Sequence, residues 1–173
     1  NKISYNSQKN KIRNTEYNNN SEPIRIYTDF TYIKSQANKN SNLVEVEKLI
    51  ENSIENSINI LKKLINVHPL SYSINKITQD DLNQWNFTSN NIDNSLLTNG
   101  AGINSDLVIL LKFIEDGEEN LLIDNEIASI SNKFILDEGT NGINGTYRPI
   151  IGVIYISNNI NITIGNIDIY LQS

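Results

Sequence analysis

Residues 106–114 read Asp-Leu-Val-Ile-Leu-Leu-Lys-Phe-Ile, and this apolar run decides the fold class. Its apolar residues do not alternate with polar ones, which is the pattern of a strand that is covered on both faces. Such a strand lies at the centre of a sheet, with helices on both sides of that sheet. The run therefore predicts an α/β or α+β domain built around a central buried strand.

Two flanking segments have the pattern of further strands. In residues 23–30 (Pro-Ile-Arg-Ile-Tyr-Thr-Asp-Phe), two isoleucines and a threonine alternate with polar residues, as in a strand with one covered face. Residues 149–156 (Pro-Ile-Ile-Gly-Val-Ile-Tyr-Ile) form another buried run after a glycine-rich loop. Gly152 lies in the middle of this run, and a glycine inside a strand usually marks the close approach of another backbone. We therefore expect Gly152→Val to destabilise the domain.

A long helix is predicted between the first strand and the central one. In residues 43–65, apolar side chains recur every three or four positions and form one stripe of about six turns. Asn42 and Glu45 have the spacing of an N-terminal capping box, while Lys62 and Lys63 lie where the helix dipole favours cations. Pro69 follows, so the helix is expected to end before it. The pattern predicts one helix that packs on the sheet.

The remaining segments have weaker patterns. Residues 1–22 show no sustained period and are expected to form a flexible tail, so that the domain spans residues 23–173. Residues 80–104 are rich in Asn, Ser and Gly and predict a long loop with a short element near Trp85 and Phe87. The other expected elements are a turn at residues 116–120, a short strand at residues 127–131, an alternating segment at residues 160–164 and the start of a helix at residues 167–171.

Composition limits the classes of function. The chain has 173 residues, a length that suits one domain, and its 20 acidic and 14 basic residues give a net charge of −6. An acidic chain without a basic face argues against nucleic acid as a main partner. No stretch approaches the roughly 20 apolar residues that a transmembrane helix needs. Cysteine is absent, which excludes disulfides and thiolate metal sites, and the lack of methionine indicates an excised piece of a longer protein.

His68 is the only histidine of the chain. A catalytic zinc ion normally takes three protein ligands, commonly imidazoles, so no histidine-based zinc site is expected here. At the end of the predicted helix, His68 is expected to interact with the helix dipole or to be exposed. A Ser-His-Asp triad would need the same histidine, and no G-x-S-x-G elbow precedes a helix, which argues against nucleophilic hydrolysis.

The acidic clusters lie beside turn residues. Asp80-Asp81, residues 116–119 and Asp137-Glu138 are expected to be solvated loops, not paired catalytic carboxylates. Residues 137–142 lack the ligand spacing and the terminal glutamate of a calcium-binding hand, so they predict a hairpin turn. The glycines match neither a dinucleotide fingerprint nor a P-loop, and nucleotide binding has no support.

The order of these segments resembles the leishmanolysin-type zinc metallopeptidases. The similar segments are residues 23–30, the long helix ending in Leu-Lys-Lys-Leu-Ile-Asn-Val at 61–67, Ser-Asp-Leu-Val-Ile at 105–109 and, above all, Tyr-Arg-Pro-Ile-Ile-Gly-Val-Ile-Tyr-Ile at 147–156. They follow one another in the family's order and near its spacing, from residue 22 to residue 173. The resemblance implies a zincin-like N-terminal subdomain, which is a twisted mixed sheet backed by a long helix.

The resemblance also implies where the chemistry lies. In the family, the active-site helix with its H-E-x-x-H motif follows the stretch that is similar to residues 166–173. Two histidines of that motif hold zinc, and the glutamate takes a proton from the metal-bound water. The resemblance therefore implies a zinc metalloendopeptidase in which this chain contributes no catalytic or metal-binding residue. We expect the chain to be inactive by itself.

A substrate-binding segment is implied as well. In zincins the edge strand of the sheet lies along the cleft and pairs with an extended peptide or protein substrate. By resemblance, Ala128, Ser129, Ile130 and Ser131 occupy that strand, and the small side chains would let a substrate backbone approach. Where the family has a cysteine shortly after this strand, the sequence has Asn132-Lys133-Phe134. The family's usual location would be extracellular or at the cell surface.

Two other interpretations stay open. One is a metal-free relative of the same fold that serves as a surface adhesion or binding module. H-E-x-x-H in the coding sequence just beyond Ser173 would favour the peptidase, and its loss would favour the binding module. The other is an unrelated α/β domain with accidental similarity, which would have no edge strand along a cleft.

Overall fold

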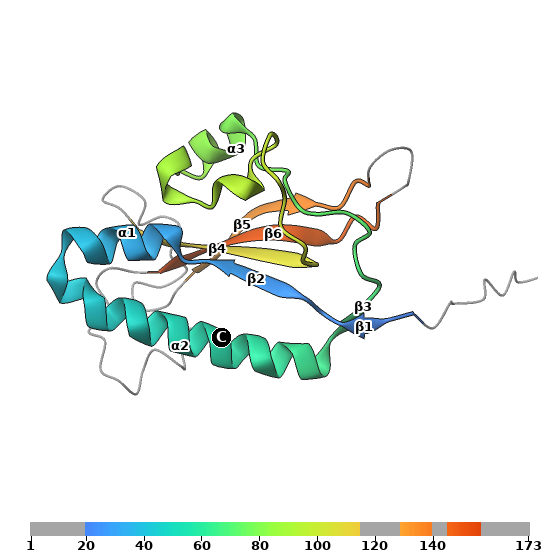
Figure 1. The fold of residues 1–173 in the computed structure, drawn as a ribbon, viewed down its shortest axis with the longest axis horizontal. Coiled ribbons are helices and arrows are strands. Elements are labelled where there is room, and N and C mark those ends of the chain that lie inside the picture. Colours follow the sequence, from blue (N-terminus) through green and yellow to red (C-terminus); the bar gives the residue numbers. More distant parts are fainter. Residues whose placement is uncertain (1–19, 115–128, 140–144, 157–173) are drawn as a thin grey trace, which may run out of the picture.

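The computed structural model describes residues 20–114, 129–139 and 145–156, of which residues 129–133 are described as backbone (Figure 1). The helices are α1 (Thr31–Lys39), α2 (Val44–Leu64) and α3 (Gln79–Gln84), with 3-10 turns at Ser41–Leu43, Ser89–Asn91 and Asn94–Leu96. The strands are β1 (Glu22–Pro23), β2 (Ile26–Asp29), β3 (Asn66–Val67), β4 (Leu107–Phe113), β5 (Ser129–Leu136) and β6 (Pro149–Ile156). Of the tail expected at residues 1–22, residues 1–19 lie outside the described residues, whereas Glu22 belongs to β1 and corrects the expected boundary. The elements expected at 116–120 and 160–171 also lie outside the described residues.

The main sheet is mixed and has the strand order β2-β4-β6-β5. Strands β2, β4 and β6 are parallel, and β5 is antiparallel to β6. The apolar run therefore forms a central strand as predicted, since β4 has a neighbour on each side. Two short strands, β1 and β3, pair separately in an antiparallel ladder.

Helices cover both faces of this sheet, as the central run predicted. Figure 1 shows α2 along one face, here the α2 face, and the segment around α3 on the opposite face, the α3 face. On the first, α2 contributes the buried residues Ile50, Ile54 and Ile58 to the core. On the second, the Tyr155 hydroxyl of β6 donates a hydrogen bond of 3.2 Å to the backbone carbonyl of Trp85. The mixed sheet and the long helix make this an α+β domain.

The prediction of a single strand at residues 23–30 is wrong, because this segment contributes to two strands, β1 and β2. The interruption lies at Ile24 and Arg25, where the chain changes partners. The Ile24 amide donates to the Ile65 carbonyl beyond α2, whereas the Arg25 carbonyl accepts from the amides of Asp106 and Leu107. One segment thus joins the β1–β3 ladder and the next joins the main sheet.

The start of the long helix also differs from the prediction. The helix α2 begins at Val44, and its N-cap residue Leu43 makes no side-chain capping bond. Asn40, not Asn42, has the capping role: its side chain accepts from the Asn42 amide and caps the preceding 3-10 turn. A nine-residue helix, α1, precedes this turn and was not predicted.

The interval at residues 80–104 is more regular than the loop that we expected. Its helix α3 begins with a capping box between Thr78 and Asp81, so Asp81 belongs to a helix start and not to a solvated loop. Leu82, Trp85 and Phe87 are buried. The short element expected near the two aromatic residues is therefore present, and it covers the α3 face.

Gly152 does not have the environment that we expected. A Cβ atom built at this position would meet no heavy atom of the described residues within 4 Å. The expectation of a close backbone approach is therefore wrong for this part of the chain. Gly152 pairs with Ile109 of β4 on one side and with Phe134 of β5 on the other.

The corrected prediction is that Gly152→Val is tolerated in the 173-residue chain. Valine favours extended backbone, and its Cβ atom would meet no described heavy atom within 4 Å. We expect the free energy of unfolding to change by less than about 1 kcal/mol, as measured by urea denaturation. Gly100→Val serves as the contrasting variant, because a Cβ atom there would lie 2.3 Å from the Asn94 carbonyl oxygen. A loss at Gly152 as large as the loss at Gly100 would contradict this reading.

Candidate functional site

The segment predicted to bind substrate lies at an edge of the main sheet. Residues 129–131 open β5, which pairs only with β6 within the described part of the sheet, through Ser129 opposite Tyr155 and Ile130 opposite Ile154. The register shifts between Ile130 and Phe134, an irregularity of the bulge type. Ala128 lies outside the described residues. The position fits strand addition, because an edge strand has backbone groups that a further strand can pair with, but contact with a substrate stays a prediction.

A row of residues in register crosses all four strands on the α2 face, and we call it the open row because its end at β6 and β5 is uncovered. Thr28, Ile109, Gly152 and Phe134 are neighbours in register from β2 to β5. Phe134 is 49% exposed, and Gly152 has the open space described above. The described residues of α2 therefore leave the β6 and β5 end of this row uncovered.

Asp106 anchors the amino ends of the parallel strands. Its fully buried carboxylate accepts from the Arg25 amide at 3.0 Å and from the Arg25 guanidinium at 2.8 and 3.0 Å. It also accepts from the Leu70 amide at 2.7 Å and from the Arg148 guanidinium at 3.3 Å. Burial alone would raise the pKa of Asp106, but Arg25 and the two amides outweigh it and lower the pKa to about 2. This carboxylate joins β2, β4, β6 and the segment after β3, so its role is structural.

Asp137 is a second buried carboxylate, which corrects the expectation of a solvated loop. It follows β5, is 3% exposed, and accepts from the Tyr72 hydroxyl and the Gly139 amide. The Thr146 amide and hydroxyl donate to it as well, each at 2.8 Å. Burial would raise the pKa of Asp137, but these donors lower it to about 2. The protein's own donors occupy the carboxylate, and it fixes the connection between β5 and β6.

The described residues do not provide a zinc site. His68 follows β3 and is exposed, so it lies beyond the last turn of α2. Within residues 20–114, 129–139 and 145–156, no three His, Cys, Asp or Glu side chains are grouped to hold a metal. By the family resemblance the zinc ligands follow Ser173, so this observation does not test the expected zinc. Within the same ranges, no helix has the length and apolarity that crossing a bilayer requires.

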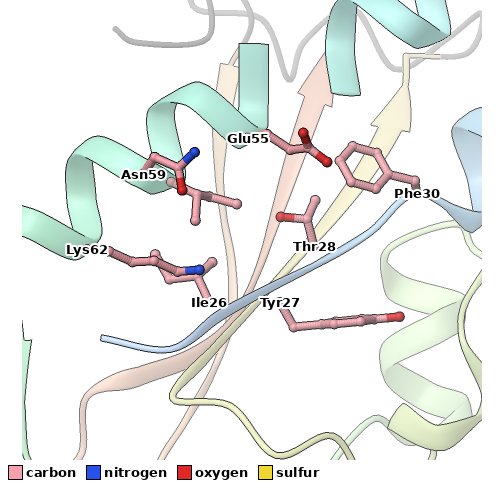
Figure 2. Close-up of a pocket in the computed structure, with 8 residues that line it drawn as sticks. Ile26, Tyr27, Thr28, Phe30, Glu55, Asn59 and Lys62 are labelled. Atoms are coloured by element: carbon pink, nitrogen blue, oxygen red, sulfur yellow. The ribbon is translucent and has the colours of Figure 1, made fainter. Parts of the chain in front are cut away.

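A pocket of about 340 Å³ lies between β2 and α2 and was not predicted (Figure 2). Glu55, Asn59 and Lys62 of α2 line one side, and β2 with Phe30 lines the other. The three polar residues have the spacing i, i+4 and i+7, which places them along one side of the helix. That spacing was visible in the sequence, but it also fits an ordinary solvated helix flank.

Comparisons with known protein families, with curated proteins and with solved structures find no match to this chain.

Proposed function

We propose that this chain is the N-terminal portion of a leishmanolysin-like zinc metalloendopeptidase, which hydrolyses peptide bonds in the longer protein. In this proposal the chain supplies the sheet scaffold of a zincin-like subdomain and the substrate-binding edge strand. The catalytic helix and the zinc ligands belong to the segment that follows Ser173. The protein would act at the cell surface or outside the cell.

The order and direction of the strands support this proposal. A scaffold for an extended substrate needs a free edge, and β5 is the antiparallel strand at one edge of the sheet. A substrate that pairs with β5 would gain main-chain hydrogen bonds, with side-chain pockets adding specificity. The long helix α2 lies on one face of the same sheet (Figure 1) and packs Ile50, Ile54 and Ile58 into the core.

The open end of the row on the α2 face is the observation that carries the proposal. Gly152 has no described neighbour within 4 Å of a Cβ position, and the adjacent Phe134 is half exposed. A glycine in register with a large apolar side chain leaves room for a helix to lie close against the sheet beside α2. A helix with an apolar stripe would bury Phe134 and gain roughly 25 cal/mol for each Å² of apolar surface removed from water. In the proposal, that helix carries H-E-x-x-H.

A catalytically dead adhesion or binding module of the same fold is the second candidate. It is favoured by the free edge of β5, which needs no metal to pair with a partner strand. The coding sequence beyond Ser173 separates the two candidates. An H-E-x-x-H motif within about the next thirty codons supports the peptidase, and a helix segment without the two histidines supports the binding module.

The 173-residue chain itself is expected to bind no stoichiometric zinc and to show no peptidase activity, because the proposed ligands and general base lie outside it. Elemental analysis after dialysis against micromolar zinc should give well below one zinc per chain. A quenched fluorescent casein substrate should remain uncleaved. The longer protein, treated in the same way, is the positive control, and tight equimolar zinc in the short chain would contradict the proposal.

A further inference from the structure

We propose that the pocket between β2 and α2 binds an extended peptide that adds as a strand to the free edge of β2. This site lies at the edge of the sheet opposite to β5. It does not depend on the proposed peptidase function, because it uses neither β5 nor the uncovered end of the row.

The backbone of β2 has groups available for such a strand. Among the described strands β2 pairs only with β4, and the Arg25 carbonyl accepts from the Leu107 amide at 3.1 Å. Successive residues of a strand direct their amide and carbonyl groups to opposite edges. The backbone carbonyl of Arg25 faces β4, so the backbone groups of Tyr27 face β4 as well. The backbone groups of Ile26 and Thr28 therefore point to the free edge. A peptide strand would therefore pair with Ile26 and Thr28.

The pocket receives side chains from such a peptide. Figure 2 shows Lys62 beside Ile26, Glu55 toward Thr28 and Phe30, and Asn59 between the two charged residues. Tyr27 points away from α2, and its hydroxyl donates to Asp93 at 2.8 Å. Every second side chain of an added strand would point to the α2 side. Those side chains would lie between β2 and the polar side of α2.

Polar groups in the pocket lack partners. The Thr28 hydroxyl oxygen is buried and makes no hydrogen bond with any described residue. A buried hydroxyl without a partner is unfavourable, so a small side-chain shift that lets a polar peptide group bond to it is favoured. Among the described residues, the side chains of Glu55, Asn59 and Lys62 make neither a hydrogen bond nor a salt bridge.

The charges define the chemistry of the peptide. Glu55 and Lys62 are seven residues apart, which is about 10 Å along a helix. Two residues that face the same side of a strand are about 7 Å apart. Long side chains span the difference between this spacing and the spacing of Glu55 and Lys62 along the helix. The fitting sequence therefore has an acidic residue beside Lys62 and a basic residue two positions away beside Glu55, with one β-branched residue between them.

Two blocked peptides test the proposal: Ac-Val-Asp-Val-Lys-Val-NH2 for parallel addition and Ac-Val-Lys-Val-Asp-Val-NH2 for antiparallel addition. Each is titrated into the ¹⁵N-labelled 173-residue chain while amide shifts and amide hydrogen exchange are followed. We expect saturable shifts at Ile26, Thr28 and Lys62 with one of the peptides. Exchange at Ile26 and Thr28 should slow at least about fivefold near saturation, while exchange at Tyr27 stays unchanged because its amide already faces β4.

Matched variants separate the pocket from general charge effects. Lys62→Glu should weaken binding about two- to fivefold, as expected for one partly exposed ion pair. Lys48→Glu changes the same charge on an exposed part of α2 outside the pocket and should leave binding unchanged. Thr28→Val should weaken binding without lowering the melting temperature, since the hydroxyl that it removes has no described partner.

Three results would overturn the proposal. One is the absence of saturable shifts with both peptides at millimolar concentration. Another is a response at residues 129–136 instead of β2, which would place binding at the opposite edge. The third is shifts in the pocket without slower exchange at Ile26 and Thr28, which would mean side-chain binding without strand addition. Replacing the central valine of each peptide by proline removes an amide donor and should abolish the exchange effect.

Discussion

Asp106→Ala should lower the free energy of unfolding by about 3–5 kcal/mol, which is the cost of removing one partner from a buried ion pair. The substitution leaves the Arg25 guanidinium, the Leu70 amide and part of the Arg148 guanidinium without their acceptor. In a domain of this size, such a loss lowers the melting temperature by roughly 10 °C. Circular dichroism during heating measures it.

The control for Asp106 is Asp80→Asn, which removes an exposed carboxylate in the first turn of α3. We expect its free energy of unfolding to change by no more than about 0.5 kcal/mol. Asp106→Asn keeps the shape and one acceptor oxygen of the side chain. Its loss of unfolding free energy should therefore lie between those of Asp106→Ala and Asp80→Asn. A melting temperature of Asp106→Ala within 2 °C or so of the unsubstituted chain would show that the carboxylate does not join the strands.

The same carboxylate predicts a loss of stability in acid. The pKa of Asp106 is lowered from 3.8 to about 2 in the folded chain, so the folded state holds its proton less tightly than the unfolded state. The resulting stability is present above pH 4 or so and is lost as the pH falls toward 2. It amounts to about 2–3 kcal/mol. Urea midpoints at pH 5.5 and pH 2.5 should differ less in Asp106→Asn than in the unsubstituted chain.

Gly152→Trp should abolish the peptidase activity that we propose for the longer protein while leaving the 173-residue chain folded. An indole on the open row would occupy the space in which we propose that the active-site helix docks. A displacement of about 1 Å in catalytic groups can cost roughly a hundredfold in rate, and blocked docking should cost at least as much. The measurement is kcat/KM on a peptide substrate, together with the melting temperature of the short chain.

A matched control for Gly152 is Ile60→Trp. Ile60 lies on α2, is 49% exposed and does not belong to the open row. The tryptophan there should leave activity within about twofold of the unsubstituted protein. Equal activity of the two variants would contradict docking at Gly152, and unfolding of the short Gly152→Trp chain would contradict the open space at that position.

The elements with a strong hydrophobic period were predictable from the sequence. The central run gave β4, the run at residues 149–156 gave β6 with the same bounds, and the long stripe gave α2 to within one residue. Each of these segments buries a continuous apolar surface. Such burial requires apolar residues at regular intervals, and this spacing is visible in the local sequence. The edge position of β5 came from the family resemblance, not from its period.

The missed features depend on contacts between distant residues. Arg25 and Asp106 are 81 positions apart, and Tyr72 and Asp137 are 65 apart, so no local pattern indicated that either carboxylate is buried. The helix α1 has only Tyr32, Ile33 and Ala37 as buried residues and no side-chain cap at its start. The prediction of a close backbone approach at Gly152 was wrong because a glycine in a strand can also leave open space. Only the neighbouring elements decide which of the two applies.

Side-chain protection of Phe134 tests whether a helix docks on the open row. Hydroxyl-radical footprinting is applied to the 173-residue chain and to the longer protein, with Tyr147, which is 67% exposed, as the internal reference. We expect Phe134 to be oxidised readily in the short chain and to be protected in the longer protein, because a helix then covers the open row. Oxidation of Phe134 to the same extent in both proteins would contradict the proposed docking.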